Sequence, residues 1–151
     1  MTTTKTTPVA VWLNLHALVM DHKWLSRDLL HDRTDGMPWS GYRVLRRVED
    51  GPRSQGEIAE LMGIDAPAVS GLVGDLVARK YVDRTADPTD GRRKLVGITD
   101  SGRAVLEGLR SVTDVVPPPV ASLTAAELRE LTRLIDKMRA SSDRGGASRH
   151  E

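Results

Sequence analysis

Apolar residues return every three or four positions along six stretches of the chain, which is the spacing of helices with a buried face. The first stretch is apolar on two faces, so we expect it to pack both on its own core and on another subunit. Consecutive prolines at 117–119 cannot continue a helix, so the fifth stretch should end before them. The predicted helices cover residues 8–33, 41–49, 54–62, 66–80, the segment from 101 towards Pro117, and 124–140.

Capping residues indicate where these helices begin and end. Residues 54–57 (Ser-Gln-Gly-Glu) and 124–127 (Thr-Ala-Ala-Glu) have the form of capping boxes. Ser40 and Asp65 are expected to cap the second and fourth helices, and Gly63 to end the third. The third and fourth helices, joined by a short turn that contains glycine, form a predicted helix-turn-helix.

After residue 80 the apolar pattern changes from helical spacing to alternation. Residues 81–85 and 94–98 are predicted to be strands, and residues 86–93 a charged, turn-rich loop between them. A helix-turn-helix followed by a hairpin with a basic tip is a winged helix. We therefore predict a mostly α fold of about six helices with a small β-hairpin wing.

The composition excludes several classes of protein. The 151 residues are 39% hydrophobic and 28% charged, which fits one folded domain, and the absence of cysteine excludes disulfide scaffolds and thiolate metal sites. No apolar run approaches the roughly 18 residues of a membrane span. With no signal-peptide pattern at the N-terminus, we expect a soluble cytoplasmic protein. We expect residues 1–7 and the Ser/Arg/Gly-rich tail 141–151 to be disordered around a single domain, 8–140.

The chain also lacks the usual patterns of enzymes and of RNA-binding sheets. It has no glycine-rich phosphate loop, no G-x-S-x-G and no H-E-x-x-H, so we predict no enzyme activity and no required cofactor. With two Tyr, three Trp and no Phe it offers few aromatic side chains on which bases could stack. If nucleic acid is the partner, a duplex bound by helices is the better interpretation.

Positive charge is concentrated in one segment of an otherwise balanced chain. Lys and Arg number 22 against 21 Asp and Glu. Residues 79–94, however, hold six basic and three acidic residues. A basic wing suits a narrow minor groove, whereas the alternative is a solvated charged hairpin. The basic residues are Arg79, Lys80, Arg84, Arg92, Arg93 and Lys94, and the acidic ones Asp83, Asp87 and Asp90.

The wing also carries a family pattern. Residues 90–99 (Asp-Gly-Arg-Arg-Lys-Leu-Val-Gly-Ile-Thr) resemble the D-x-R-x-x-x-V-x-L-T signature of the MarR (multiple antibiotic resistance regulator) family, with Ile98 in place of the leucine. The resemblance extends over about residues 9–140 and is most specific over 52–104. The flanking matches are residues 56–61 (Gly-Glu-Ile-Ala-Glu-Leu), 87–90 (Asp-Pro-Thr-Asp) and 101–102 (Ser-Gly).

The resemblance implies a homodimeric repressor of transcription that binds a roughly palindromic site on double-stranded DNA. The dimerisation helices would be about 8–33 and 101–140, and the winged helix-turn-helix about 38–99. Many family members release DNA when a small phenolic or anionic effector binds between the dimerisation and DNA-binding parts. The candidate dimer-interface residues are Leu13, Leu109, Leu128, Leu131, Leu134 and Ile135.

The candidate DNA contacts come from a helix N-terminus, the recognition helix and the wing. Ser70 can hydrogen-bond a base edge or a phosphate, and Ala68 can meet a thymine methyl group. Gly71 stands where the family often has a basic residue, so arginine-to-guanine readout is absent there. By resemblance Arg92 reaches the groove, while Asp90 braces an arginine. The full set is Ser54, Gln55, Pro67, Ala68, Ser70, Gly71, Arg84, Asp90, Arg92, Arg93 and Lys94.

Some of these residues have equally plain structural interpretations. Ser54 is first of all a helix cap, although a helix N-terminus also favours a phosphate. Gly71 and Gly74 could allow close packing within the protein or close approach of the backbone to DNA. A further group of arginines could contact flanking phosphates or form a solvated face; these are Arg43, Arg46, Arg47 and Arg53.

An effector pocket and a metal site are two further hypotheses. The pocket candidates are Trp12, His16, Trp24, Trp39, Tyr42 and Arg43, with Met37 and Met62, although such residues at helical spacing also build cores. His16 or Arg43 could pair with an anion. His16, His22 and His31 lie along the first predicted helix, but His16 and His22 are about 600° apart around it and face different ways. We predict no metal site in one chain. A metal-gated regulator and a winged helix that binds protein instead of DNA remain the alternatives.

Overall fold

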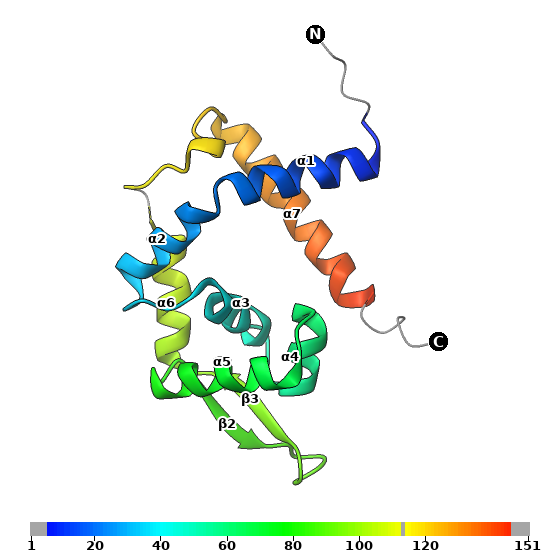
Figure 1. Ribbon diagram of the computed structural model, residues 1–151, viewed down its shortest axis with the longest axis vertical. Coiled ribbons are helices and arrows are strands. Elements are labelled where there is room, and N and C mark those ends of the chain that lie inside the picture. The colour runs from blue at the N-terminus through cyan, green and yellow to red at the C-terminus, as the bar shows by residue number, and fades with distance from the viewer. Residues whose placement is uncertain (1–5, 113, 146–151) are drawn as a thin grey trace.

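The computed structural model describes residues 6–112 and 114–145, and within them it is mostly helical with a three-stranded sheet (Figure 1). This confirms the predicted mostly α winged-helix fold. The elements are α1 (Pro8–Asp21), α2 (Lys23–Arg33), α3 (Trp39–Val48), β1 (Arg53–Ser54), α4 (Gln55–Met62), α5 (Ala66–Ala78), β2 (Val82–Ala86), β3 (Lys94–Ile98), α6 (Asp100–Arg110), the 3-10 helix η1 (Pro118–Val120) and α7 (Ala125–Gly145).

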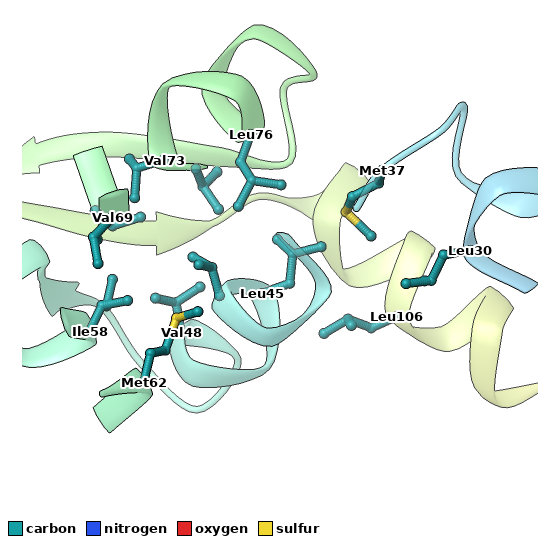
Figure 2. Close-up of a cluster of buried hydrophobic side chains, with 13 residues drawn as sticks. Leu30, Met37, Leu45, Val48, Ile58, Met62, Val69, Val73, Leu76 and Leu106 are labelled. Carbon is teal, nitrogen blue, oxygen red and sulfur yellow. The ribbon is translucent and has the colours of Figure 1, made fainter. Parts of the chain in front are cut away.

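The winged helix surrounds one closed core, which Figure 2 shows. Helices α4 and α5 form the helix-turn-helix, and their axes turn by 112° at the break between them. Each buries one apolar face against α3 and the sheet. The buried hydrophobic residues are Leu30, Met37, Val44, Leu45, Val48, Ile58, Met62, Val69, Val73, Leu76, Val82, Val96 and Leu106.

The caps that define the helix-turn-helix form as predicted. The Ser54 side chain accepts from the Glu57 N–H (3.3 Å), and the Glu57 carboxylate accepts from the Ser54 N–H (2.7 Å). Gly63 ends α4 in the left-handed conformation (φ +67°), and the Asp65 carboxylate caps α5 at the Ala68 N–H (2.8 Å). These short-range bonds fix the turn between the two helices.

The sheet has the order β1-β3-β2 and is antiparallel throughout. Strands β2 and β3 form the predicted hairpin, with Arg84 opposite Val96 and Ala86 opposite Lys94. Strand β1 was not predicted. It has only two residues, and it exists because Arg53 and Ser54 pair with Val96 and Leu95, some forty positions later in the chain.

Three predicted helix boundaries were wrong. The helix expected over residues 8–33 breaks at His22, where the ring Nδ1 hydrogen-bonds to the Leu18 carbonyl (2.9 Å) and the backbone N–H donates to the Met20 carbonyl. Ser40 does not cap α3, because the helix already begins at Trp39 after an extended Pro38. The helix expected to run to residue 80 ends at Ala78, and Lys80 adopts a positive φ of 62°.

The C-terminal helix is longer than expected. The second capping box forms at Thr124 and Glu127 (3.3 and 2.8 Å), and α7 then continues to Gly145, through residues assigned to a disordered tail from 141 onwards. At the other end, Thr7 caps α1, so order begins before residue 8. Residues 1–5 and 146–151 of the predicted disordered ends lie outside the described residues.

Helices α1 and α7 stand apart from the closed core. Figure 1 shows α1 at the end of the molecule opposite β2 and β3. No residue of α1, which the structure describes in full, is buried, and its Trp12 and Leu13 side chains are about 60% exposed. Within the described residues no single helix has both the length and the apolar character to cross a membrane; by those two criteria alone, only the bent α4–α5 pair could.

Candidate nucleic-acid interface

The outer face of α5 is made of small residues. Val69, Val73 and Leu76 point into the core, whereas Pro67, Ala68, Ser70 and Gly71 are exposed. A Cβ atom at Gly71 or Gly74 would meet nothing within 4 Å. Packing within the protein therefore does not require glycine at either position, and close approach of DNA to the backbone stays a prediction.

The N-terminus of α4 is occupied by its own capping box. The Ser54 hydroxyl donates to Glu57 Oε2 (2.7 Å) and accepts from the Glu57 N–H, so it is already engaged on both sides. These bonds, aided by the charges of Arg93 and Arg53, hold the pKa of the Glu57 carboxyl below its ordinary value. Gln55, half-buried, follows directly. Within this chain, Ser54 acts as a cap, and its predicted phosphate contact remains a prediction.

The loop of the wing is held by two aspartates. Asp87 is buried, and its carboxylate accepts from the N–H and the hydroxyl of Thr89 (2.8 and 2.7 Å), which lowers the pKa of that carboxyl. Asp90 accepts from the backbone N–H of Arg92 (3.1 Å). The predicted bracing role of Asp90 therefore involves the backbone of an arginine, and it fixes the position from which the Arg92 side chain leaves the loop.

The basic side chains of the wing fall into two groups. Arg93 lies 4.0 Å from both Glu57 Oε2 and Asp87 Oδ2, so its charge is balanced within the protein. Arg84, Arg92 and Lys94 are exposed, and among the described residues none of the three has an ion-pair partner. Three positive charges without ion-pair partners among the described residues thus lie along one hairpin, together with the exposed carboxylates of Asp83 and Asp90.

The arginines of α3 serve the fold. Arg43 and Arg47 donate to the carbonyls of Met62 and Leu61 (3.1 and 3.5 Å), which are free acceptors at the C-terminus of α4. Arg46 pairs with Glu49, and Arg53 donates to the Arg47 carbonyl (2.6 Å). Arg43 and Arg47 thus tie α3 to α4, whereas Arg46 pairs with the C-cap of its own helix; the phosphate contacts considered from the sequence stay predictions.

The winged-helix part of the chain is similar to known proteins. A model described as MarR family matches residues 35–93, which contain the helix-turn-helix and most of the wing. The HTH-type transcriptional repressor NicR of Pseudomonas putida is 31% identical over 102 residues, 65% of this chain and 63% of NicR. Residues 35–93 of this chain therefore match the MarR family. The chain covers about three fifths of the length of its curated relatives.

Solved structures of the MarR fold extend the likeness over nearly the whole chain. A MepR mutant from a multidrug-resistant S. aureus clinical isolate has a TM-score of 0.75 at 23% identity, covering 91% of this chain and 99% of that one. Another S. aureus MepR mutant, bound to an oligodeoxyribonucleotide, has a TM-score of 0.56 at 25% identity, covering 87% and 96%. The MarR family, which residues 35–93 match, is a family of transcriptional regulators, and the prediction of no enzyme activity agrees with that match.

Two hollows flank the stacked rings of Trp39 and Tyr42, whose centroids are 4.7 Å apart. One, of about 300 Å³, lies between α2, α3 and α6. The other, of about 410 Å³, lies between α3 and α7 and includes Arg43. The first is lined by Ser26, Leu29, Leu30, Trp39, Tyr42, Leu109 and Arg110.

The other predicted pocket residues do not line these hollows. Trp12 and His16 stack on each other on the open surface of α1, with centroids 6.5 Å apart. Trp24 is also exposed, and Met37 and Met62 are part of the core. Along the first two helices, helical spacing did not distinguish core, pocket and open surface, because apolar residues occur at helical spacing in all three.

The histidines are engaged separately. His22 bonds to the Leu18 carbonyl, and His31 Nδ1 lies 3.4 Å from its neighbour Asp32. Across residues 6–112 and 114–145 no group of three His, Asp or Glu side chains is placed to hold a metal ion. The candidate interface residues divide evenly: Leu13, Leu128 and Leu134 are exposed, and Leu109, Leu131 and Ile135 are half-buried.

Proposed function

We propose that this chain is a homodimeric regulator, a cytoplasmic repressor, that binds a pseudo-palindromic site on double-stranded DNA. The observation that carries the proposal is the wing: Arg92 projects from a loop whose backbone Asp90 fixes, beside Arg84 and Lys94, and none of the three has an ion-pair partner among the described residues. An arginine at a wing tip suits the minor groove, where the negative potential is greatest.

In this proposal α5 enters the major groove. Its exposed small residues let the helix backbone come close to the base edges, with Ser70 as a hydrogen-bonding group and Ala68 as an apolar contact. Two relatives support this direction: NicR is a transcriptional repressor, and a MepR mutant has been solved with an oligodeoxyribonucleotide.

The homodimer is supported by the open apolar faces of α1 and α7. Leu13 on α1 and Leu134 on α7 are 60% and 41% exposed. A second copy of the chain would cover these faces, and two winged helices related by a two-fold axis would then contact two half-sites of a palindrome.

The test is a salt series of duplex binding measured by fluorescence anisotropy, with a scrambled duplex as control. Duplexes would come from DNA flanking the gene and from a random pool selected with the wild-type protein. Phosphate contacts make the logarithm of the affinity fall linearly with the logarithm of the salt concentration. Arg92→Ala should weaken binding to every duplex and lower this slope by about one. Arg133→Ala, which removes an exposed arginine from α7, should leave the slope unchanged.

Two results of the salt series would contradict the proposal. If the wild-type protein binds neither duplex at low salt, the DNA-binding proposal is wrong, and the alternative of a winged helix that binds another protein gains support. If it binds but Arg92→Ala leaves the slope intact, Arg92 is not at the interface.

We further propose that the hollow of about 300 Å³ receives a small phenolic or anionic effector. Leu29, Leu30 and Leu109 give it apolar walls, and the Trp39–Tyr42 stack offers an aromatic surface. The hollow lies where α2, α3 and α6 meet, so an occupant would act on the junction between the winged helix and the outer helices. Titration with 4-hydroxybenzoate should release bound duplex, and Tyr42→Ala should raise the concentration needed. Metal analysis of the purified protein tests the metal-gated alternative.

A further inference from the structure

One arginine joins the recognition helix α5 to the turn between α2 and α3. Arg79 follows the last residue of α5, and its side chain is only 23% exposed. Its Nε donates to Asp75 Oδ2 (2.8 Å), one turn back on the same helix. Its Nη1 donates to the backbone carbonyl of Asp35 (2.8 Å), with the carbonyl of Thr34 at 3.4 Å.

The turn that receives Arg79 connects α2 with α3. Asp35 and Gly36 both have positive φ (51° and 73°), which reverses the chain at the end of α2. Thr34 is buried, and its hydroxyl donates to the Leu30 carbonyl (2.6 Å) and accepts from the Met37 N–H (3.2 Å). Side-chain and backbone bonds therefore hold this turn in one conformation.

Arg79 provides a cation at the C-terminal end of α2. The last carbonyls of a helix have no partner within it, and they carry the negative end of the helix dipole. The acceptors that Arg79 satisfies are the carbonyls of Thr34, the C-cap of α2, and of Asp35, one residue beyond it, while Asp75 holds the guanidinium from the other side. Sequence reasoning grouped Arg79 with the basic wing; the signal for its other partner was the four-residue spacing from Asp75, which suits a helical ion pair.

We infer that Arg79, oriented by Asp75, is a positioning residue that sets the angle between the recognition helix and α2, and through α2 the direction of the outer helix α1. This inference rests on the proposed function. In a dimer joined through the outer helices, that angle determines the separation of the two α5 helices. The Arg79 clamp, meaning Arg79, Asp75 and the carbonyls of residues 34 and 35, therefore sets which spacing between half-sites is bound best.

Half-site spacing is a sensitive readout of such an angle. Each added base pair moves the second half-site by about 3.4 Å along the duplex and turns it by about 35° around the axis. Two α5 helices held at a fixed angle lose contacts with the second half-site after either change. If the contact between Arg79 and the turn at residues 34 and 35 is lost, α5 can move to the displaced half-site with little loss of affinity.

The experiment compares duplexes built from one selected operator. One carries the operator as selected, two have a base pair inserted or deleted between the half-sites, and one carries a single half-site. Anisotropy gives the affinities of the wild type, Arg79→Ala, Asp75→Asn and the control Arg27→Ala, which removes an exposed arginine from α2. Thermal unfolding and sedimentation confirm that each variant is folded and dimeric.

The wild type and Arg27→Ala should lose about tenfold in affinity when the spacing changes by one base pair, a loss of the order of one base contact. Arg79→Ala and Asp75→Asn should reduce that loss to about threefold or less, with unchanged affinity for the single half-site. Asp75→Asn separates positioning from direct contact. If Arg79 and Asp75 faced the phosphates, removal of a negative charge would strengthen binding to every duplex, including the single half-site.

Three results would overturn the inference. Undiminished spacing dependence in both variants means that the clamp does not set the angle. Equal loss on the half-site and on the full operator means that Arg79 contacts DNA or only supports the fold. If the wild type binds no duplex, both the proposed function and the positioning role of Arg79 are wrong. If the wild type binds and its affinity depends on the spacing, the proposed function stands and only the positioning role is tested by the variants.

Discussion

The winged helix and the outer helices use the same apolar pattern to different ends. In the winged helix the apolar stripes pack on one another, and large aliphatic side chains such as Leu45 and Ile58 are fully buried. Helices α1 and α7 carry stripes of the same kind, but no described side chain on either one is buried. The periodicity of apolar residues thus shows that a helix face must be buried. It does not show whether the residues that bury it belong to the same chain. The winged helix is complete within one chain, and the outer helices are not.

The largest expected effect is on the outer helices. Leu134→Asp would place a charge without a partner in the interface between two copies, at a cost of about 3–5 kcal/mol for each buried charge. The protein should then sediment as a single chain of 16.6 kDa with its helical circular dichroism retained. Arg129→Asp, at an exposed position about 140° around α7 from Leu134, is the matched control and should remain dimeric. A Leu134→Asp variant that stays dimeric would contradict the assignment of this face.

Truncation of a buried side chain tests whether the core of the winged helix is closed within one chain. Leu45 is 0% exposed, and Leu45→Ala should lower the free energy of unfolding by about 2–5 kcal/mol through lost burial and a residual cavity. Val116→Ala, at a site that is 63% exposed, should change it by less than about 0.5 kcal/mol. Urea denaturation measures both. Similar values for the two variants would mean that the core is not closed around Leu45.

The two capping boxes allow the same substitution in both regions. Ser54→Ala should cost about 1 kcal/mol, and Thr124→Ala should cost less, because Ser54 is buried and Thr124 is exposed. Hydrogen bonds from these residues lower the pKa of Glu57 and Glu127 in the folded protein. Ionised carboxylates therefore stabilise the fold above their ordinary pKa of 4.5, and this contribution disappears as the pH falls through the lowered, folded pKa.

Urea midpoints at pH 7 and pH 3 measure this dependence. The wild type should lose stability on acidification, and Ser54→Ala should lose less, since its Glu57 has lost the hydroxyl bond that most lowers its pKa. A Ser54→Ala variant with the full acid sensitivity of the wild type would show that this box does not account for the titration of Glu57.

The smallest effect separates stability from binding. Gly71→Ala on α5 and Gly108→Ala on α6 each add a methyl group that would meet nothing within 4 Å. Both should stabilise the protein by about 0.5–1 kcal/mol, because alanine loses less backbone entropy in a helix. Only Gly71→Ala should weaken duplex binding, because it adds bulk where α5 approaches the bases. Equal duplex binding by the two variants would remove Gly71 from the interface.

Local chemistry determined how much of the fold could be predicted. Both capping boxes and the end at Gly63 were predicted because their partners lie within a few residues, and the hairpin because its two strands follow each other in sequence with one loop between them. The break at His22 was missed because apolar spacing runs through it, and only the ring bond to Leu18 reveals it. Strand β1 was missed because its partners in β3 are distant in sequence.

The same limit applies to the candidate site. The resemblance of residues 90–99 pointed to the wing, and its exposed cations were found there. The sequence could not show which arginines are neutralised by the fold: Arg93 is balanced by Glu57 and Asp87, and Arg43 by a helix terminus. Those partners come from other elements, so only the folded chain separates them from Arg92.

The central claim is that one chain holds a complete winged helix and half of a dimer interface, so that DNA is bound by two chains together. Native mass spectrometry of the wild-type protein with its selected duplex tests this most directly. The account predicts a complex of two chains per duplex, and no stable complex of one chain with the full operator. A stable complex of one chain with the duplex, or no complex at all, would contradict it.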